Sequence, residues 1–95
     1  MAKKRQGKTR DYVELANRTL RENPATSLLG FEAVSVTHGR AVLKMEVQAK
    51  HRQLHGVVHG GVLAALADTA GAIAVYTTVP RGTALATVEI GRAHV

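Results

Sequence analysis

The stretch HGGVLAALADTAGAIAVY, at residues 59–76, decides the fold. Its length and its alanine content favour a helix. That helix would be apolar on all sides, a pattern typical of a helix buried all round. Asp68 lies at its middle, which favours a buried helix of a soluble domain over a membrane span. We therefore expect one long helix at the centre of the fold.

The segments around this helix predict a small antiparallel sheet and one further helix. Residues 31–37 (FEAVSVT) and 40–47 (RAVLKMEV) alternate apolar and polar side chains, which predicts a hairpin. Residues 83–90 (TALATVEI) predict a third strand. Residues 11–22 have apolar side chains at helical spacing, and a connector follows at 26–30. Together these elements predict an α+β domain.

The size and composition of the chain restrict its chemistry. Its 95 residues form one domain at most, and a domain this small gains stability from oligomerisation. The chain has no cysteine, which excludes disulfides, thiolate metal ligands and a cysteine nucleophile.

The net charge of +6 comes mainly from one end of the chain. Residues 1–10 hold five of the thirteen Lys and Arg residues and no acid. We interpret this segment as a basic disordered tail rather than as a nucleic-acid-binding face. A tail that contacts the phosphates of a small ligand or of RNA is the alternative. Because no apolar stretch follows the basic start, we expect no secretory signal. We also expect no membrane association and a cytoplasmic location.

Gly60 and Gly61 lie where a loop enters the central helix. The first turn of a helix has backbone N–H groups without partners, at the positive end of the helix dipole. Glycine lets a ligand approach these groups closely, so they could form an oxyanion hole for acyl transfer. Taken alone, the two glycines fit a simple helix entry better.

Asp68 is the only acidic residue between Glu46 and Glu89, and it lies two helical turns after Gly61 on the same face. An isolated carboxylate in an apolar helix costs free energy unless it is paired or has a task. Asp68 is therefore a candidate to activate water or to attack an acyl carbon directly. The alternative is a structural carboxylate paired with an arginine or a backbone N–H.

Three histidines, His51, His55 and His59, repeat at a four-residue spacing that could place metal ligands on one helix face. The glycines among them argue against a helix, and no Glu or Cys completes a zinc set. We therefore predict no metal site.

A motif with several fixed spacings joins these residues. It reads His51-x-Gln53-x-x-Gly56-x-Val58-His59-Gly60-Gly61, followed after four residues by Leu66-Ala67-Asp68-Thr69-Ala70. This motif resembles the signature of hotdog-fold acyl-CoA thioesterases of the phenylacetic acid degradation type, in the 4-hydroxybenzoyl-CoA thioesterase-like superfamily. The resemblance runs from about Gly30 to Ile90.

The resemblance implies a hotdog fold, in which a curved antiparallel sheet wraps around one long central helix. It also implies homodimers, often paired into homotetramers, with each active site at the dimer interface. The implied reaction is hydrolysis of an acyl-CoA or aryl-CoA thioester to the free acid and CoA, without a cofactor.

By motif position, the resemblance makes Asp68 the catalytic carboxylate. The backbone N–H of Gly60 or Gly61 would polarise the thioester carbonyl, and His59 would orient that carbonyl or the loop. Gln53 falls where relatives usually carry Asn, a residue that positions water or the carbonyl from the partner subunit.

Three further residues are expected to contact the substrate by the same resemblance, namely Gly61, His51 and Thr87. Thr87 falls where some relatives use Ser or Thr to hold the nucleophilic water.

The end of the chain departs from the family. After Ile90 the family would continue with further strands, whereas this chain stops at Val95. A common sequencing adapter encodes residues 90–95 when read in frame. We therefore expect a partial hotdog domain at 11–90 and a non-native tail at 91–95.

Other functions are compatible with the same fold. An enoyl-thioester hydratase or dehydratase would pair His with an acid in a different layout. A non-catalytic acyl-CoA-binding regulator would carry a DNA-binding helix-turn-helix before this domain, and residues 1–30 are too short for one. The acid at the middle of the central helix favours the thioesterase.

Overall fold

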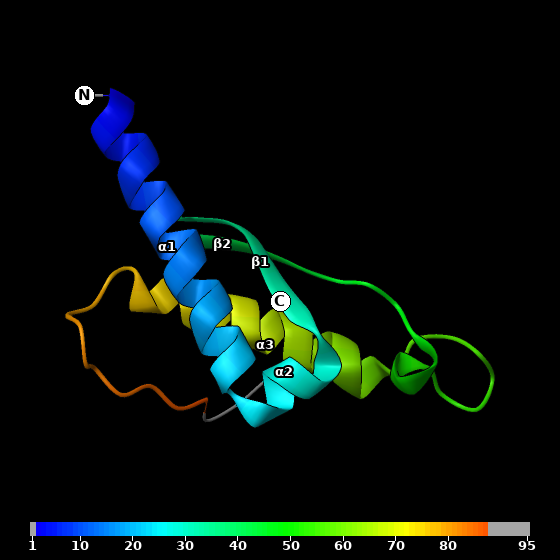
Figure 1. Ribbon diagram of the computed structural model, residues 1–95. Coiled ribbons are helices and arrows are strands. Elements are labelled where there is room, and N and C mark those ends of the chain that lie inside the picture. The colour runs from blue at the N-terminus through cyan, green and yellow to red at the C-terminus, as the bar shows by residue number, and fades with distance from the viewer. Residues whose placement is uncertain (1, 88–95) are drawn as a thin grey trace, which may run out of the picture.

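The computed structural model describes residues 2–87. They form an α+β arrangement with one antiparallel hairpin and a long helix, consistent with part of a hotdog fold (Figure 1). The elements in chain order are α1 (Ala2–Glu22), α2 (Pro24–Leu29), β1 (Phe31–Thr37), β2 (Arg40–Met45), the 3-10 helix η1 (Ala49–His51) and α3 (Gly60–Tyr76).

Helix α1 begins at Ala2, nine residues before the predicted start at 11. The basic segment that we expected to be disordered continues this helix, because Lys, Arg and Gln are good helix formers and no proline interrupts them. The connector expected at 26–30 is also partly helical. It forms α2, which the Asn23 side chain caps by accepting a hydrogen bond from Ala25 N–H at 3.1 Å.

The predicted hairpin is confirmed, with β2 ending at Met45 rather than at 47. A β-bulge between Ala33 and Ser35 places one extra residue in β1. The bulge changes which side chains face inward. Val34 is therefore 52% exposed, whereas Val36 lies on the inner face with Phe31 and is 1% exposed.

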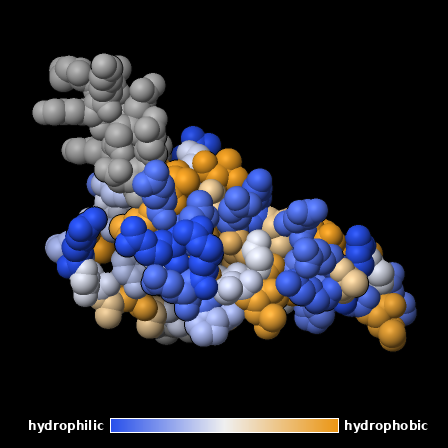
Figure 2. Space-filling view, in the orientation of Figure 1, coloured by the Kyte–Doolittle hydropathy of each residue, from blue (hydrophilic) through white to orange (hydrophobic). Residues whose placement is uncertain are grey.

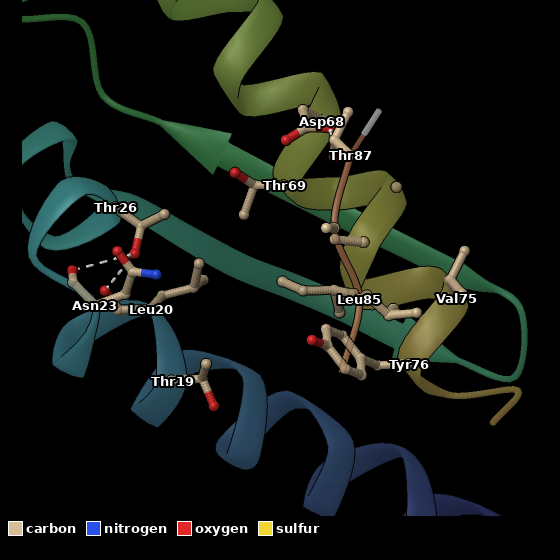
Figure 3. Close-up of a pocket in the computed structure, with 14 residues that line it drawn as sticks. Thr19, Leu20, Asn23, Thr26, Asp68, Thr69, Val75, Tyr76, Leu85 and Thr87 are labelled. Atoms are coloured by element: carbon tan, nitrogen blue, oxygen red, sulfur yellow. Dashed lines mark hydrogen bonds between the residues drawn. The ribbon is translucent and has the colours of Figure 1, made fainter. Parts of the chain in front are cut away.

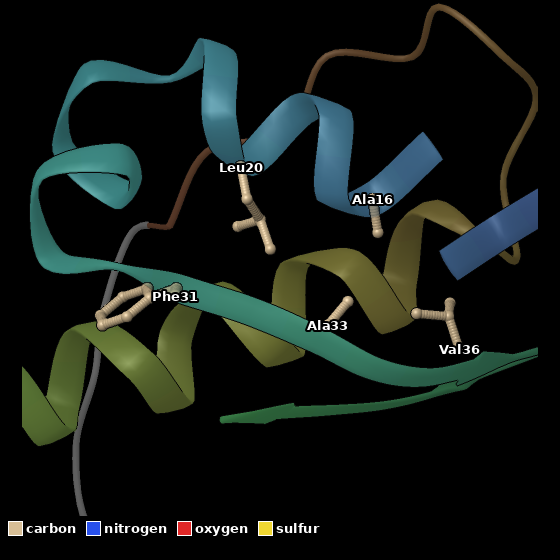
Figure 4. Packing of buried hydrophobic residues seen from close by; sticks show 5 residues of the cluster. All are labelled: Ala16, Leu20, Phe31, Ala33 and Val36. Atoms are coloured by element: carbon tan, nitrogen blue, oxygen red, sulfur yellow. The ribbon is translucent and has the colours of Figure 1, made fainter. Parts of the chain in front are cut away.

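The core lies where α1, β1 and α3 meet. Ala16 and Leu20 of α1 pack against Phe31, Ala33 and Val36 of β1 (Figure 4). Apolar residues of α3 and β2 pack around this cluster. The five fully buried residues of this core are thus aliphatic except for Phe31.

The central helix is confirmed, since α3 covers residues 60–76 of the predicted 59–76. Its burial on all sides is not found, because no residue of α3 is fully buried. Leu63, Val75 and Tyr76 each keep about half of their surface exposed. The reason is that the two strands described here cover only one side of the helix. Its other side is available to further strands or to another chain.

The third strand predicted at 83–90 is not formed over residues 83–87, which have no strand partner. Residues 88–90 and the expected tail at 91–95 lie outside the described residues. Among residues 2–87, no helix is long and apolar enough to span a membrane.

Candidate active site

Of the first four backbone N–H groups of α3, three donate hydrogen bonds to His59. The Gly61 N–H donates to Nδ1 of the capping residue His59 at 2.9 Å. The carbonyl of His59 accepts from Val62 N–H at 3.0 Å and from Leu63 N–H at 3.2 Å. Within residues 2–87 the N–H of Gly60 has no acceptor. Gly60 is therefore the amide that can donate to a ligand.

This arrangement distinguishes the two glycines that the motif left as alternatives. A Cβ atom at Gly61 would lie 3.0 Å from Nδ1 of His59, so glycine is needed there for the cap. A Cβ at Gly60 would meet nothing within 4 Å. Gly61 thus supports the cap rather than contacting the substrate through its amide, and Gly60 lies open at the positive end of the helix.

His59 caps the helix and also presents a donor. A neutral imidazole that accepts at Nδ1 carries its proton on Nε2. The His59 side chain is exposed, so this Nε2–H can reach a ligand beside the Gly60 amide. The orienting role of His59 at the entrance to α3 stays a prediction.

Asp68 and Thr87 lie together, as Figure 3 shows, although they are 19 residues apart in the chain. The Thr87 hydroxyl donates to Oδ1 of Asp68 at 2.6 Å. No arginine or backbone N–H pairs with the Asp68 carboxylate in the described part of the chain. Within residues 2–87, the structural role that we considered for Asp68 has no arginine or backbone partner, and its Oδ2 forms no hydrogen bond.

A cavity of about 650 Å³ adjoins Asp68 between α1 and α3. Leu20, Ile73, Tyr76 and Leu85 contribute apolar walls, and Asp68 lies at one end (Figure 3). A cavity of this size is within the range of small-molecule sites.

Gly60 and Asp68 do not meet within one chain. Eight residues separate them along α3, which corresponds to about 12 Å at a helical rise of ~1.5 Å per residue. One thioester carbonyl cannot contact both groups of the same chain.

Gln53 also lies away from Asp68. It belongs to the loop 52–58, whose ends pair in an isolated bridge between Arg52 and Val58. The Gln53 side chain is exposed and forms no hydrogen bond with any residue from 2 to 87. Figure 1 shows this loop projecting beyond the first turn of α3, where it is available to a second chain.

His51 differs from its prediction as a substrate contact. Its side chain is 1% exposed, and both ring nitrogens are bonded to the backbone. The ring therefore has neither access nor a free nitrogen with which to bind a substrate. Among the described residues, no group of three His, Cys, Asp or Glu side chains could hold a metal ion.

Comparison with known proteins found one family match and one similar protein. Residues 55–93 match the thioesterase superfamily. Over 66 residues the chain is 36% identical to a 1,4-dihydroxy-2-naphthoyl-CoA hydrolase of Listeria monocytogenes serotype 1/2a (strain 10403S). The match covers 70% of this chain and 54% of the relative, so the chain spans about half of that protein's length. No solved structure matches the chain significantly.

Proposed function

We propose that this chain, which matches the thioesterase superfamily over residues 55–93, forms the catalytic part of a hotdog-fold acyl-CoA thioesterase. The proposal rests on two polar groups of α3, the Gly60 amide and the Asp68 carboxylate. Among residues 2–87, the Gly60 amide at the N-terminus of α3 has no acceptor, and the Asp68 carboxylate has a hydroxyl partner but no positively charged one.

We propose that the site is completed by a second copy of the chain. The separation of about 12 Å prevents Gly60 and Asp68 of one chain from sharing a carbonyl. The second copy would bring its own Gly60 and Gln53 to Asp68 of the first. The exposed side of α3 and the exposed Leu54 and Val57 offer apolar surface for this contact.

The hydrolysis would proceed by attack of water on the thioester carbon. Asp68 would accept a proton from a water molecule that the Thr87 oxygen helps to hold. The Gly60 N–H and the His59 Nε2–H would stabilise the oxyanion as the C–O bond forms. The C–S bond then breaks, the CoA sulfur receives the proton, and the free acid leaves.

Direct attack by the Asp68 carboxylate is the competing mechanism, because it would form an anhydride that water later opens. A single turnover in ¹⁸O-labelled water separates the two. Attack by water places the label in the acid product. Attack by Asp68, followed by opening of the anhydride by water at the Asp68 carbonyl, instead gives an unlabelled acid and a labelled Asp68 carboxylate, so label in Asp68 identifies this route.

We propose an aromatic acyl group as the substrate. The similar Listeria protein is named for an aromatic thioester, and the cavity beside Asp68 has apolar walls that include Tyr76. A flat ring system would gain contact with these walls.

The test is CoA release by the full-length protein from aryl-CoA and aliphatic acyl-CoA thioesters, with Asp68→Asn assayed in parallel. We expect the aryl thioesters to give the higher kcat/KM, and the variant to lose about 100-fold or more of kcat. A wild-type kcat retained by Asp68→Asn would remove this carboxylate from the mechanism. A folded oligomer that hydrolyses none of the thioesters would indicate an acyl-CoA-binding protein instead.

A further inference from the structure

We propose that His51 is a positioning residue, which holds the Gly60 amide in place through a buried, neutral imidazole. The effect of His51 on catalysis rests on the proposed function, whereas the hydrogen bonds that place His51 do not. No substrate contact is needed, because the effect passes through the backbone at the entrance to α3.

The imidazole of His51 joins two segments that are distant in sequence. Its Nε2 donates to the carbonyl of Leu29 at 2.7 Å, and its Nδ1 accepts from Gln48 N–H at 2.8 Å. A carbonyl only accepts and a backbone N–H only donates, so one protonation state fits both bonds. This state is the neutral ring with its proton on Nε2. The ring is 1% exposed, so water cannot replace either partner.

The backbone of the same residue connects the ring to the helix entrance. The carbonyl of His51 accepts from His59 N–H at 2.8 Å. His59 then caps α3 through Gly61, and Gly60 lies between these two residues. A displacement of His51 therefore moves both donors of the proposed oxyanion hole.

The loop 52–58 does not provide an alternative anchor. It closes on itself through Gln53 N–H to Val57 O at 2.8 Å and Gly56 N–H to Gln53 O at 2.9 Å. At its base, one hydrogen bond, from His59 N–H to the carbonyl of His51, connects the residue before the loop to the residue that caps α3. The ring of His51 consequently holds the end of α2 and the N-cap residue of η1 together, and the His51 carbonyl connects them to the start of α3.

The first test is the protonation state of His51, measured by ¹⁵N NMR of the histidine side chains in the full-length protein. We expect a neutral ring protonated at Nε2 near pH 7. A ring protonated at Nδ1, or on both nitrogens, would overturn the proposal even if no variant folds.

The second test uses His51→Asn, whose Oδ1 can still accept from Gln48 N–H but whose shorter side chain cannot donate to Leu29. Amide hydrogen exchange at Gly61 reports the cap without requiring catalysis. We expect exchange at this amide to accelerate about 10-fold or more, since one buried hydrogen bond is lost. The matched control is His55→Asn, at an exposed position of the loop 52–58, and it should leave the exchange at Gly61 unchanged.

The catalytic test measures kcat and KM of His51→Asn separately. Misplaced oxyanion donors weaken transition-state binding alone, so kcat of His51→Asn should fall about 10-fold with little change in KM. A loss that only follows the fraction of unfolded protein, with Gly61 exchange and kcat per folded molecule unchanged, would overturn the proposal. A wild-type protein without hydrolase activity would refute the proposed function, and the exchange measurement would still decide the role of His51.

Discussion

At the residue scale, Gly60 and Gly61 have the same side chain but different surroundings. The amide of Gly61 is bonded to the ring of His59, whereas that of Gly60 has no acceptor among residues 2–87. The sequence could place both at a helix entrance but could not separate them, because the difference depends on the rotamer of the capping histidine. The burial of His51 could not be predicted from the sequence either, because no sequence pattern links His51 to its hydrogen-bond partners Leu29 and Gln48.

Replacing Gly60 by proline removes the amide hydrogen while preserving the helix. Proline is well tolerated at the first position of a helix, and His59 already has the extended backbone, with ψ of 130°, that a residue before proline prefers. We expect kcat to fall about 100-fold or more, with the free energy of unfolding nearly unchanged. Steady-state kinetics and chemical denaturation measure the two quantities. Undiminished turnover would show that the oxyanion is stabilised elsewhere.

Replacing Gly61 by alanine should act on the cap instead. The new Cβ would lie 3.0 Å from the His59 ring and would push it out of hydrogen-bonding position. Loss of an N-cap costs about 1 kcal/mol, which we expect to appear in the free energy of unfolding together with a reduced kcat. Gly60→Ala is the matched control, since its Cβ meets nothing within 4 Å of the same chain. Equal stability of the two variants would contradict the assignment of His59 as the cap.

At the scale of the elements, α3 and the hairpin could be predicted because their patterns are long and local. The alanine-rich run at 59–76 indicates one helix, and the alternation at 31–37 and 40–47 indicates two strands. The bulge in β1 could not be predicted, since it arises only when β1 pairs with β2. The strand expected at 83–90 failed over 83–87 for the related reason that a strand needs a neighbour.

Two matched substitutions test the bulge. Val36 is 1% exposed and Val34 is 52% exposed, although strict alternation would place them on one face. We expect Val36→Ala to lower the free energy of unfolding by about 2 kcal/mol and Val34→Ala by less than about 1 kcal/mol. Urea denaturation of both variants measures the difference. Equal losses would mean that β1 has no bulge in solution.

At the scale of the whole molecule, one chain leaves apolar surface without cover. Figure 2 shows hydrophobic residues at the end of the molecule where the loop 52–58 projects in Figure 1. Leu54 is 96% exposed, and one side of α3 is also open. A second copy would cover such surface and would bring a free Gly60 amide to the carboxylate of the first chain. Tetramers, which the family resemblance implies, remain a prediction for sedimentation measurements.

The most direct test of the shared site is complementation between two inactive chains. Asp68→Asn and Gly60→Pro are prepared separately in the full-length protein, mixed under conditions that exchange subunits, and assayed for CoA release. A site made from both chains is intact once in each mixed dimer, so the mixture should regain about a quarter of the wild-type activity. A mixture that exchanges subunits but stays as inactive as its two components would contradict a site shared between chains.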